Sequence, residues 1–217
     1  MQRWLNVFVQ FSLSLAIVVA TISVATFAAV PLAHAQQPSA APATAADEIP
    51  PAALKTPKFD KAYLAPVDGI SVRQYAHIVF DMFANDEQDT KKLLAKYGLT
   101  QARFDTINAA MIKRMQDDQT RKFIDIYGAY YIEEAPGQFA KLARDVAQSV
   151  LSGGPLRERE PMTWKEYMKF QGYYARKAPF ARDTSRAAYD DILSDQGMNF
   201  IDFQVLGAWF GRQLALQ

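Results

Sequence analysis

The chain has 217 residues, of which half are apolar and 22% are charged, with 24 basic side chains, 23 acidic side chains and no cysteine. This balance offers neither the basic excess of a nucleic-acid binder nor a polybasic patch for a membrane surface. The lack of cysteine excludes a disulfide scaffold, a thiol nucleophile and a thiolate metal site.

Residues 1–35 have the pattern of a secretory signal peptide. Arg3 gives the positive start, a long uncharged run follows, and Ala33-His34-Ala35 is typical of a signal peptidase site. We therefore expect cleavage between Ala35 and Gln36 and a periplasmic or secreted bacterial protein. The alternative is a membrane anchor that stays uncleaved, because the uncharged run is long enough to span a bilayer.

Beyond the signal segment, composition divides the chain into a linker and one domain. Residues 36–58 are rich in proline and alanine and bury too little apolar surface to fold, so we expect a disordered linker. Residues 59–217 lack the alternating pattern of strands and are numerous enough for one core, which predicts a single compact all-helical domain.

Two segments of this domain begin with the same helix-start pattern. Ser71 and Gln74 form a predicted capping box, and Thr163 and Glu166 form another 92 residues later. The apolar stripe expected behind the first box comprises Val72, Tyr75, Ala76, Val79, Met82 and Phe83. The stripe behind the second comprises Trp164, Tyr167, Met168, Tyr174 and Ala175.

A helix–turn–helix junction also occurs twice. Gly98 and Gly197 stand where a left-handed residue ends a helix, and each precedes a helix with apolar residues spaced 3, 4 and 4. The two stripes expected to be buried are Phe104, Ile107, Met111, Met115 and Phe203, Leu206, Phe210, Leu214. We infer two degenerate helical repeats, at about 69–116 and about 161–216.

Connecting helices are expected at about 118–151, between the two repeats. One is marked by aromatic residues from Phe123 to Tyr131, and the next by apolar residues from Phe139 to Val150. Pro136 is expected in the first turn of the second of these helices.

The sequence assigns no catalytic, cofactor-binding or metal-ligating residue. His77 is the one histidine after the signal segment, so a histidine-based zinc site is excluded and any further ligands would be carboxylates. We expect His77 to be an ordinary residue at the edge of the packed face. Phosphate-binding loops and the nucleophile elbow of serine hydrolases are absent.

Carboxylate pairs are read as structural. Asp117-Asp118 precede a helix and suit its N-terminus, whereas Glu133-Glu134 and Asp190-Asp191 are expected on solvated faces. Paired carboxylates for glycoside cleavage remain an alternative, because their separation is set by the fold.

The aromatic residues suit either core packing or a binding surface. The binding hypothesis places a partner-binding patch at Tyr130, Tyr173, Trp209 and Arg212, because Tyr, Trp and Arg are enriched in interface hot spots.

Together these features favour an exported, non-enzymatic helical module that binds another envelope protein, for example as an accessory subunit of an envelope complex. No cofactor and no nucleic acid is implied, and a membrane enters only if the N-terminal segment stays uncleaved. The alternatives are a carboxylate-dependent hydrolase of cell-wall glycan and a binder of a small apolar ligand between helices.

Overall fold

The computed structural model describes residues 58–84, 90–181 and 185–217. Within these ranges the chain forms eight α-helices, two short 3-10 helices and no strand, which confirms the expected compact helical domain. The α-helices are α2 (Val72–Ala84), α3 (Thr90–Lys96), α4 (Gln101–Asp117), α5 (Lys122–Ile132), α6 (Ala140–Ser152), α7 (Trp164–Lys177), α8 (Arg186–Ser194) and α9 (Phe200–Ala215). The 3-10 helices are η1 (Lys61–Leu64) and η2 (Ala178–Phe180).

The signal segment and nearly all of the expected linker, residues 1–57, lie outside the described residues. In the ranges that are described, no helix has the length and apolar character needed to cross a bilayer.

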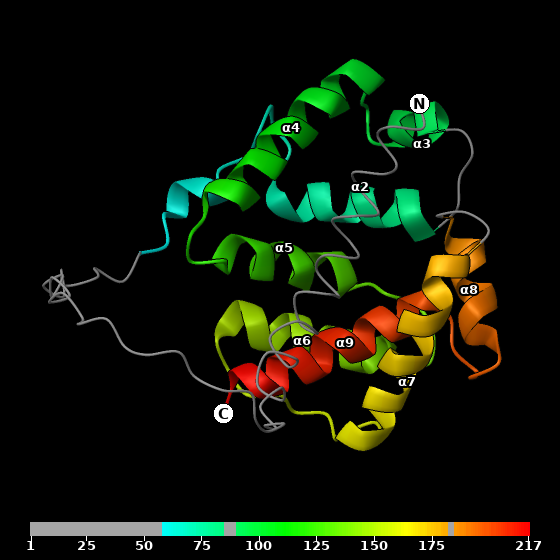
Figure 1. Ribbon diagram of the computed structural model, residues 1–217. Coiled ribbons are helices and arrows are strands. Elements are labelled where there is room, and N and C mark those ends of the chain that lie inside the picture. Colours follow the sequence, from blue (N-terminus) through cyan, green and yellow to red (C-terminus); the bar gives the residue numbers. More distant parts are fainter. Residues whose placement is uncertain (1–57, 85–89, 182–184) are drawn as a thin grey trace, which may run out of the picture.

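Helix α5 lies in the middle of the bundle (Figure 1). It packs against α2 on one side and against α6 on the other, and α6 packs in turn against α9. Helix α3 contacts α2 and α4, and α4 also contacts α5. Helix α8 contacts α7 and α9, and these three helices form the other end of the bundle. The two connecting helices, α5 and α6, therefore join the α2–α4 group to the α7–α9 group.

Both predicted capping boxes are confirmed. Ser71 N donates to Gln74 Oε1 at 3.0 Å, and Gln74 N donates to Ser71 Oγ at 3.2 Å. At the start of α7, Thr163 N donates to Glu166 Oε2 at 2.8 Å, and Glu166 N donates to Thr163 Oγ1 at 3.3 Å. Each box satisfies two amides that the first turn of a helix leaves without partners.

The two glycine junctions have the same local geometry. Gly98 and Gly197 both have φ of 67°, a conformation that glycine adopts without a Cβ clash. Leu99 N donates to Leu94 O at 3.0 Å, and Met198 N, 99 residues later, donates to Leu193 O at 3.3 Å. That the α2–α4 and α7–α9 groups are copies of one repeat stays a prediction.

The apolar stripe expected for α4 is confirmed, and the other three are partly wrong. On α2, Met82 and Phe83 are only half-buried, whereas Ile78 and Phe80, which the stripe left out, are buried. The expected residues Tyr167, Tyr174, Phe203, Leu206 and Phe210 are buried. In contrast, Trp164, Met168 and Leu214 are 39%, 41% and 45% exposed, and Ala175 is also exposed. Helix α7 lies at the outside of the bundle, and its two buried residues, Tyr167 and Tyr174, are seven positions apart, so it contacts the core through a narrow stripe.

The start of α6 also differs from the expectation. The helix begins at Ala140, with Phe139 as its N-cap residue, so Pro136 lies in the preceding turn and not in the first turn of the helix.

Candidate functional site

An open pocket of about 550 Å³ lies where the end of α5 meets α2 and α6. Six of its eight lining residues are charged or polar, and we call it the polar pocket. Its lining residues are Arg73, Glu133, Glu134, Arg144, Ala147, Gln148, Leu151 and Ser152.

The polar pocket is bordered by a polar stripe on α2. Arg73, His77 and Asp81 are spaced four residues apart, so they share one face of the helix. Arg73 Nε donates to Glu133 Oε1 at 2.5 Å, and His77 Nε2 lies 2.6 Å from the same oxygen. The Glu133 side chain is 13% exposed, so this carboxylate is held between two nitrogen donors with little access to water.

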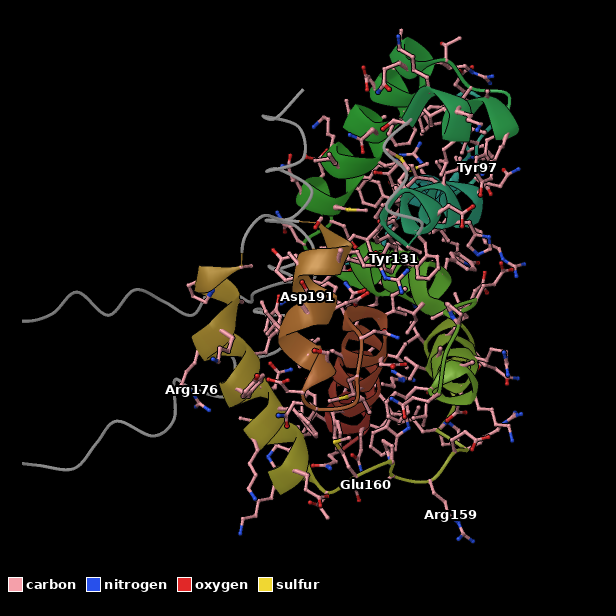
Figure 2. All side chains as sticks on the ribbon, turned by 90° about the vertical axis from the view of Figure 1, so that its right-hand side faces the viewer. Tyr97, Tyr131, Arg159, Glu160, Arg176 and Asp191 are labelled. Carbon is pink, nitrogen blue, oxygen red and sulfur yellow. The ribbon has the colours of Figure 1, made fainter. Side chains whose placement is uncertain are left out.

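Further interactions are made along this polar stripe of α2, which forms the rim of the polar pocket. A hydrogen bond and the negative charge of Glu133 raise the pKa of Arg73, whose guanidinium lies 5.9 Å from the centre of the Tyr130 ring. Tyr97 donates to the Asp81 carboxylate, and burial, followed by Asp81 and Glu134, raises the Tyr97 pKa. Figure 2 shows Tyr97 between α3 and α2, so the polar rim reaches from the end of α5 to α3.

The structure corrects one expectation near this pocket. Glu133 is not on a solvated face, because α5 packs beside α2 and the carboxylate faces Arg73 and His77. His77 is half-buried, as expected for the edge of the packed face, and it also contacts a carboxylate 56 positions away in the chain. The sequence signal for this site was the spacing of Arg73, His77 and Asp81, which places three polar side chains on one face.

Two other carboxylates from the predicted pairs, Asp118 and Asp190, have structural roles. Asp118 accepts hydrogen bonds from Phe123 N at 2.7 Å and Thr120 N at 2.9 Å, which confirms the expected place of this residue before a helix. Asp190 was expected on a solvated face, but it is half-buried and its Oδ1 accepts from Phe200 N at 2.7 Å. It thus satisfies an amide in the first turn of α9.

The four residues of the predicted partner-binding patch do not form one surface. Trp209 is 3% exposed, so its ring belongs to the core and is not available to a partner. Arg212 Nε donates to Ser149 Oγ at 2.8 Å, which ties α9 to the end of α6. Tyr130 lies near Arg73, and the Tyr173 hydroxyl donates to Asp195 at 3.3 Å, between α7 and the end of α8.

A different group of apolar side chains is exposed on α7 and α9. Trp164, Met168 and Leu214 form what we call the α7–α9 face, and each is at least 39% exposed. The Trp164 ring lies 5.5 Å from the rings of both Tyr167 and Phe210, which are buried. Met168 is one helical turn from Trp164, and Leu214 is one turn from Phe210, on which the Trp164 ring packs.

Basic side chains accompany this apolar group. Lys165 and Lys169 are exposed on α7, directly after Trp164 and Met168 in the chain. Glu166 is exposed on the same turn and interacts with Lys169, so the apolar group has charged neighbours of both signs.

Comparisons with protein-family models, with curated proteins and with solved structures found no match to this chain.

The geometry of the polar pocket bears on its chemistry. Glu133 and Glu134 lie in one pocket, as a carboxylate-dependent hydrolase requires. However, Glu133 Oε1 already has two nitrogen donors, so this oxygen is not free to protonate a leaving group. Four of its eight lining residues are charged, and a binder of a small apolar ligand between helices stays an alternative.

Proposed function

We propose that the protein is an exported, non-enzymatic helical module that binds another protein of the bacterial envelope, for example as an accessory subunit of an envelope complex. The observation that carries this proposal is the exposure of Trp164 on the α7–α9 face. Large exposed apolar groups that lie together are typical of interaction sites, and tryptophan is enriched among the residues that contribute most to binding.

The rigidity of this tryptophan supports a role as an anchor. Its ring packs against two buried aromatic rings, Tyr167 and Phe210, which restricts the conformations that it adopts before binding. A side chain that is already ordered loses less entropy when a partner covers it.

A hydrolase acting on cell-wall glycan is the second candidate, favoured by the presence of Glu133 and Glu134 in one pocket. Cleavage of glycan by the purified protein, abolished by both Glu133→Gln and Glu134→Gln, is the result that supports this second candidate against the first.

The test of the proposed function compares variants in affinity purification. The protein is expressed from its full-length gene with a C-terminal tag and recovered from the envelope. Trp164→Ala is compared with Leu64→Ala, a matched control in which another exposed apolar side chain, 37% exposed, is truncated away from the face. Thermal unfolding confirms that both variants are folded.

The proposal predicts a stoichiometric partner that is retained by Leu64→Ala and lost by Trp164→Ala. Equal recovery of the partner with both variants contradicts it, and so does tight binding of the protein to anionic vesicles in place of any protein. The intact mass of the same sample tests the predicted cleavage, because processing after Ala35 gives a chain that begins at Gln36.

A further inference from the structure

Three groups that could coordinate a metal ion converge beside the polar pocket. One nitrogen of His77 and one carboxylate oxygen each from Glu133 and Glu134 all lie within 4.8 Å of one another. We propose that these three residues bind a divalent first-row transition-metal ion, with Zn²⁺ as the representative ion. This site is separate from the α7–α9 face, and the inference does not depend on the proposed function.

The distances require a small rearrangement. Two ligands of a tetrahedral zinc ion, with bonds of about 2.0–2.1 Å, are roughly 3.3 Å apart. His77 Nε2 and Glu133 Oε1 are 2.6 Å apart in a hydrogen bond, so the ion separates this pair and takes the place of the shared proton. The separations of up to 4.8 Å within the group then close toward the ion. Glu134 is exposed, so its side chain is free to make that movement.

The ligand types select the class of ion. One imidazole nitrogen with two carboxylate oxygens suits Zn²⁺ and its neighbours in the first transition row. Ca²⁺ and Mg²⁺ prefer sites made entirely of oxygen, so His77 disfavours them. The two carboxylates, the neutral imidazole and the Arg73 guanidinium that pairs with Glu133 carry a net charge of −1, which offsets half of the charge of the ion.

The residues around the three ligands are consistent with a metal site that keeps one coordination position open. Arg73 Nε donates to Glu133, so this carboxylate has a hydrogen-bonded neighbour of the kind that orients metal ligands. Three protein ligands leave at least one coordination position for water or a bound ligand. Glu133 and Glu134 line the polar pocket, so that position is next to a space that is open to a ligand.

The competing explanation is a purely structural ion pair among Arg73, His77 and Glu133. Glu134 separates the two explanations, because the hydrogen bonds of Arg73 and His77 are made to Glu133. The ion pair has no need of Glu134, whereas the metal site loses one of its three ligands without it.

The first experiment is calorimetric titration of the protein, expressed from its full-length gene, with Zn²⁺ alone. The variants are His77→Gln, Glu133→Gln and Glu134→Gln. Glu160→Gln is the matched control, since Figure 2 shows Glu160 in the α6–α7 connection at the opposite end of the molecule from Tyr97. We expect one ion per chain and a loss of affinity of at least about tenfold in each ligand variant, with Glu160→Gln unchanged.

The second experiment observes the imidazole directly. The sequence contains two histidines, His34 and His77, and His77→Gln assigns their nitrogen resonances in long-range proton–nitrogen spectra. We expect Zn²⁺ to shift the Nε2 resonance of His77 in the native chain, and Glu134→Gln to need at least about tenfold more Zn²⁺ for the same shift. No binding at millimolar Zn²⁺, binding that survives all three ligand variants, or equal binding of Ca²⁺ that survives His77→Gln overturns the proposal.

Discussion

Tyr75 donates a hydrogen bond of 2.5 Å to Asn108 Oδ1 in the core, where it links α2 to α4. The two residues are 1% and 4% exposed, so water does not replace the bond when it is lost. Burial raises the pKa of the Tyr75 hydroxyl, which therefore remains a donor across the neutral pH range.

The effect of replacing Tyr75 on stability is expected to depend on whether Asn108 is present. Tyr75→Phe leaves the amide oxygen of Asn108 buried without this donor, and we expect it to lower the free energy of unfolding by about 1–3 kcal/mol. The double variant Tyr75→Phe, Asn108→Leu is expected to lose less than the sum of the two single variants. Urea denaturation of the four proteins measures the coupling, and strictly additive losses contradict it.

Asp118 predicts a pH dependence of stability. Burial acts to raise its pKa, but hydrogen bonds from Phe123 N, Thr120 Oγ1 and Thr120 N outweigh burial and lower it. A lowered folded-state pKa contributes stability that is present above the unfolded-state pKa of about 3.9 and is lost as the pH falls through the folded-state pKa.

The corresponding variant is Asp118→Asn. We expect the free energy of unfolding to fall by about 1–2 kcal/mol at pH 7. This difference from the native protein becomes smaller below about pH 4. Asp117→Asn is the control, because Asp117 pairs with the exposed Lys113 and such pairs contribute little. A gap that stays constant from pH 7 to pH 2 is the result that counts against this assignment.

Gly137 is expected to be less replaceable than Gly98. Its φ is 102°, and a Cβ added to it lies 2.9 Å from Asp202 Oδ1, an oxygen of a buried side chain. Gly98 has φ of 67° with open space around it, so substitution there meets only backbone strain. We expect Gly98→Ala to cost about 1–2 kcal/mol and Gly137→Ala about 2–4 kcal/mol, measured by urea denaturation. Equal costs would show that crowding at Asp202 is unimportant.

Arg212 is expected to act in stability and not in partner binding. Its guanidinium donates to Ser149 Oγ, to Ser149 O at 2.9 Å and to Gly154 O at 3.1 Å. Arg212→Ala therefore lowers the free energy of unfolding by about 1–3 kcal/mol, and Arg212→Lys recovers only part, because an ammonium lacks the planar fork. Partner recovery is expected to be unchanged at a temperature where Arg212→Ala is folded. Loss of the partner from that folded variant would return Arg212 to the binding surface.

Local signals in the sequence predicted the elements of the fold well. The boxes at Ser71 and Thr163 are set by residues three positions apart, and the glycine turns by single residues, so neither depends on distant parts of the chain. The α4 stripe was also predictable, because every member faces the core.

The exposed and buried aromatics were less predictable. Periodicity identified one face of α9 but not how far neighbouring helices extend along it, so Leu214 is exposed and Trp209 is buried. Trp164 lies on the apolar stripe of α7, as expected. It is at the end of the helix, however, where its ring packs on one side only.

The contact between His77 and Glu133 was beyond local reasoning. It requires α2 and α5 to pack side by side at one particular register, and this register depends on the whole bundle. Only the spacing of polar residues on α2 was available in advance.

The most direct test of the central claim, that the α7–α9 face binds a partner protein, is photo-crosslinking in living cells. A photoreactive residue replaces Met168 on the face, and a second protein carries it at Leu64 as the matched exposed position. The account predicts one crosslinked product from position 168, none from position 64, and loss of the product when Trp164→Ala is added. No product from position 168, or the same product from both positions, contradicts it.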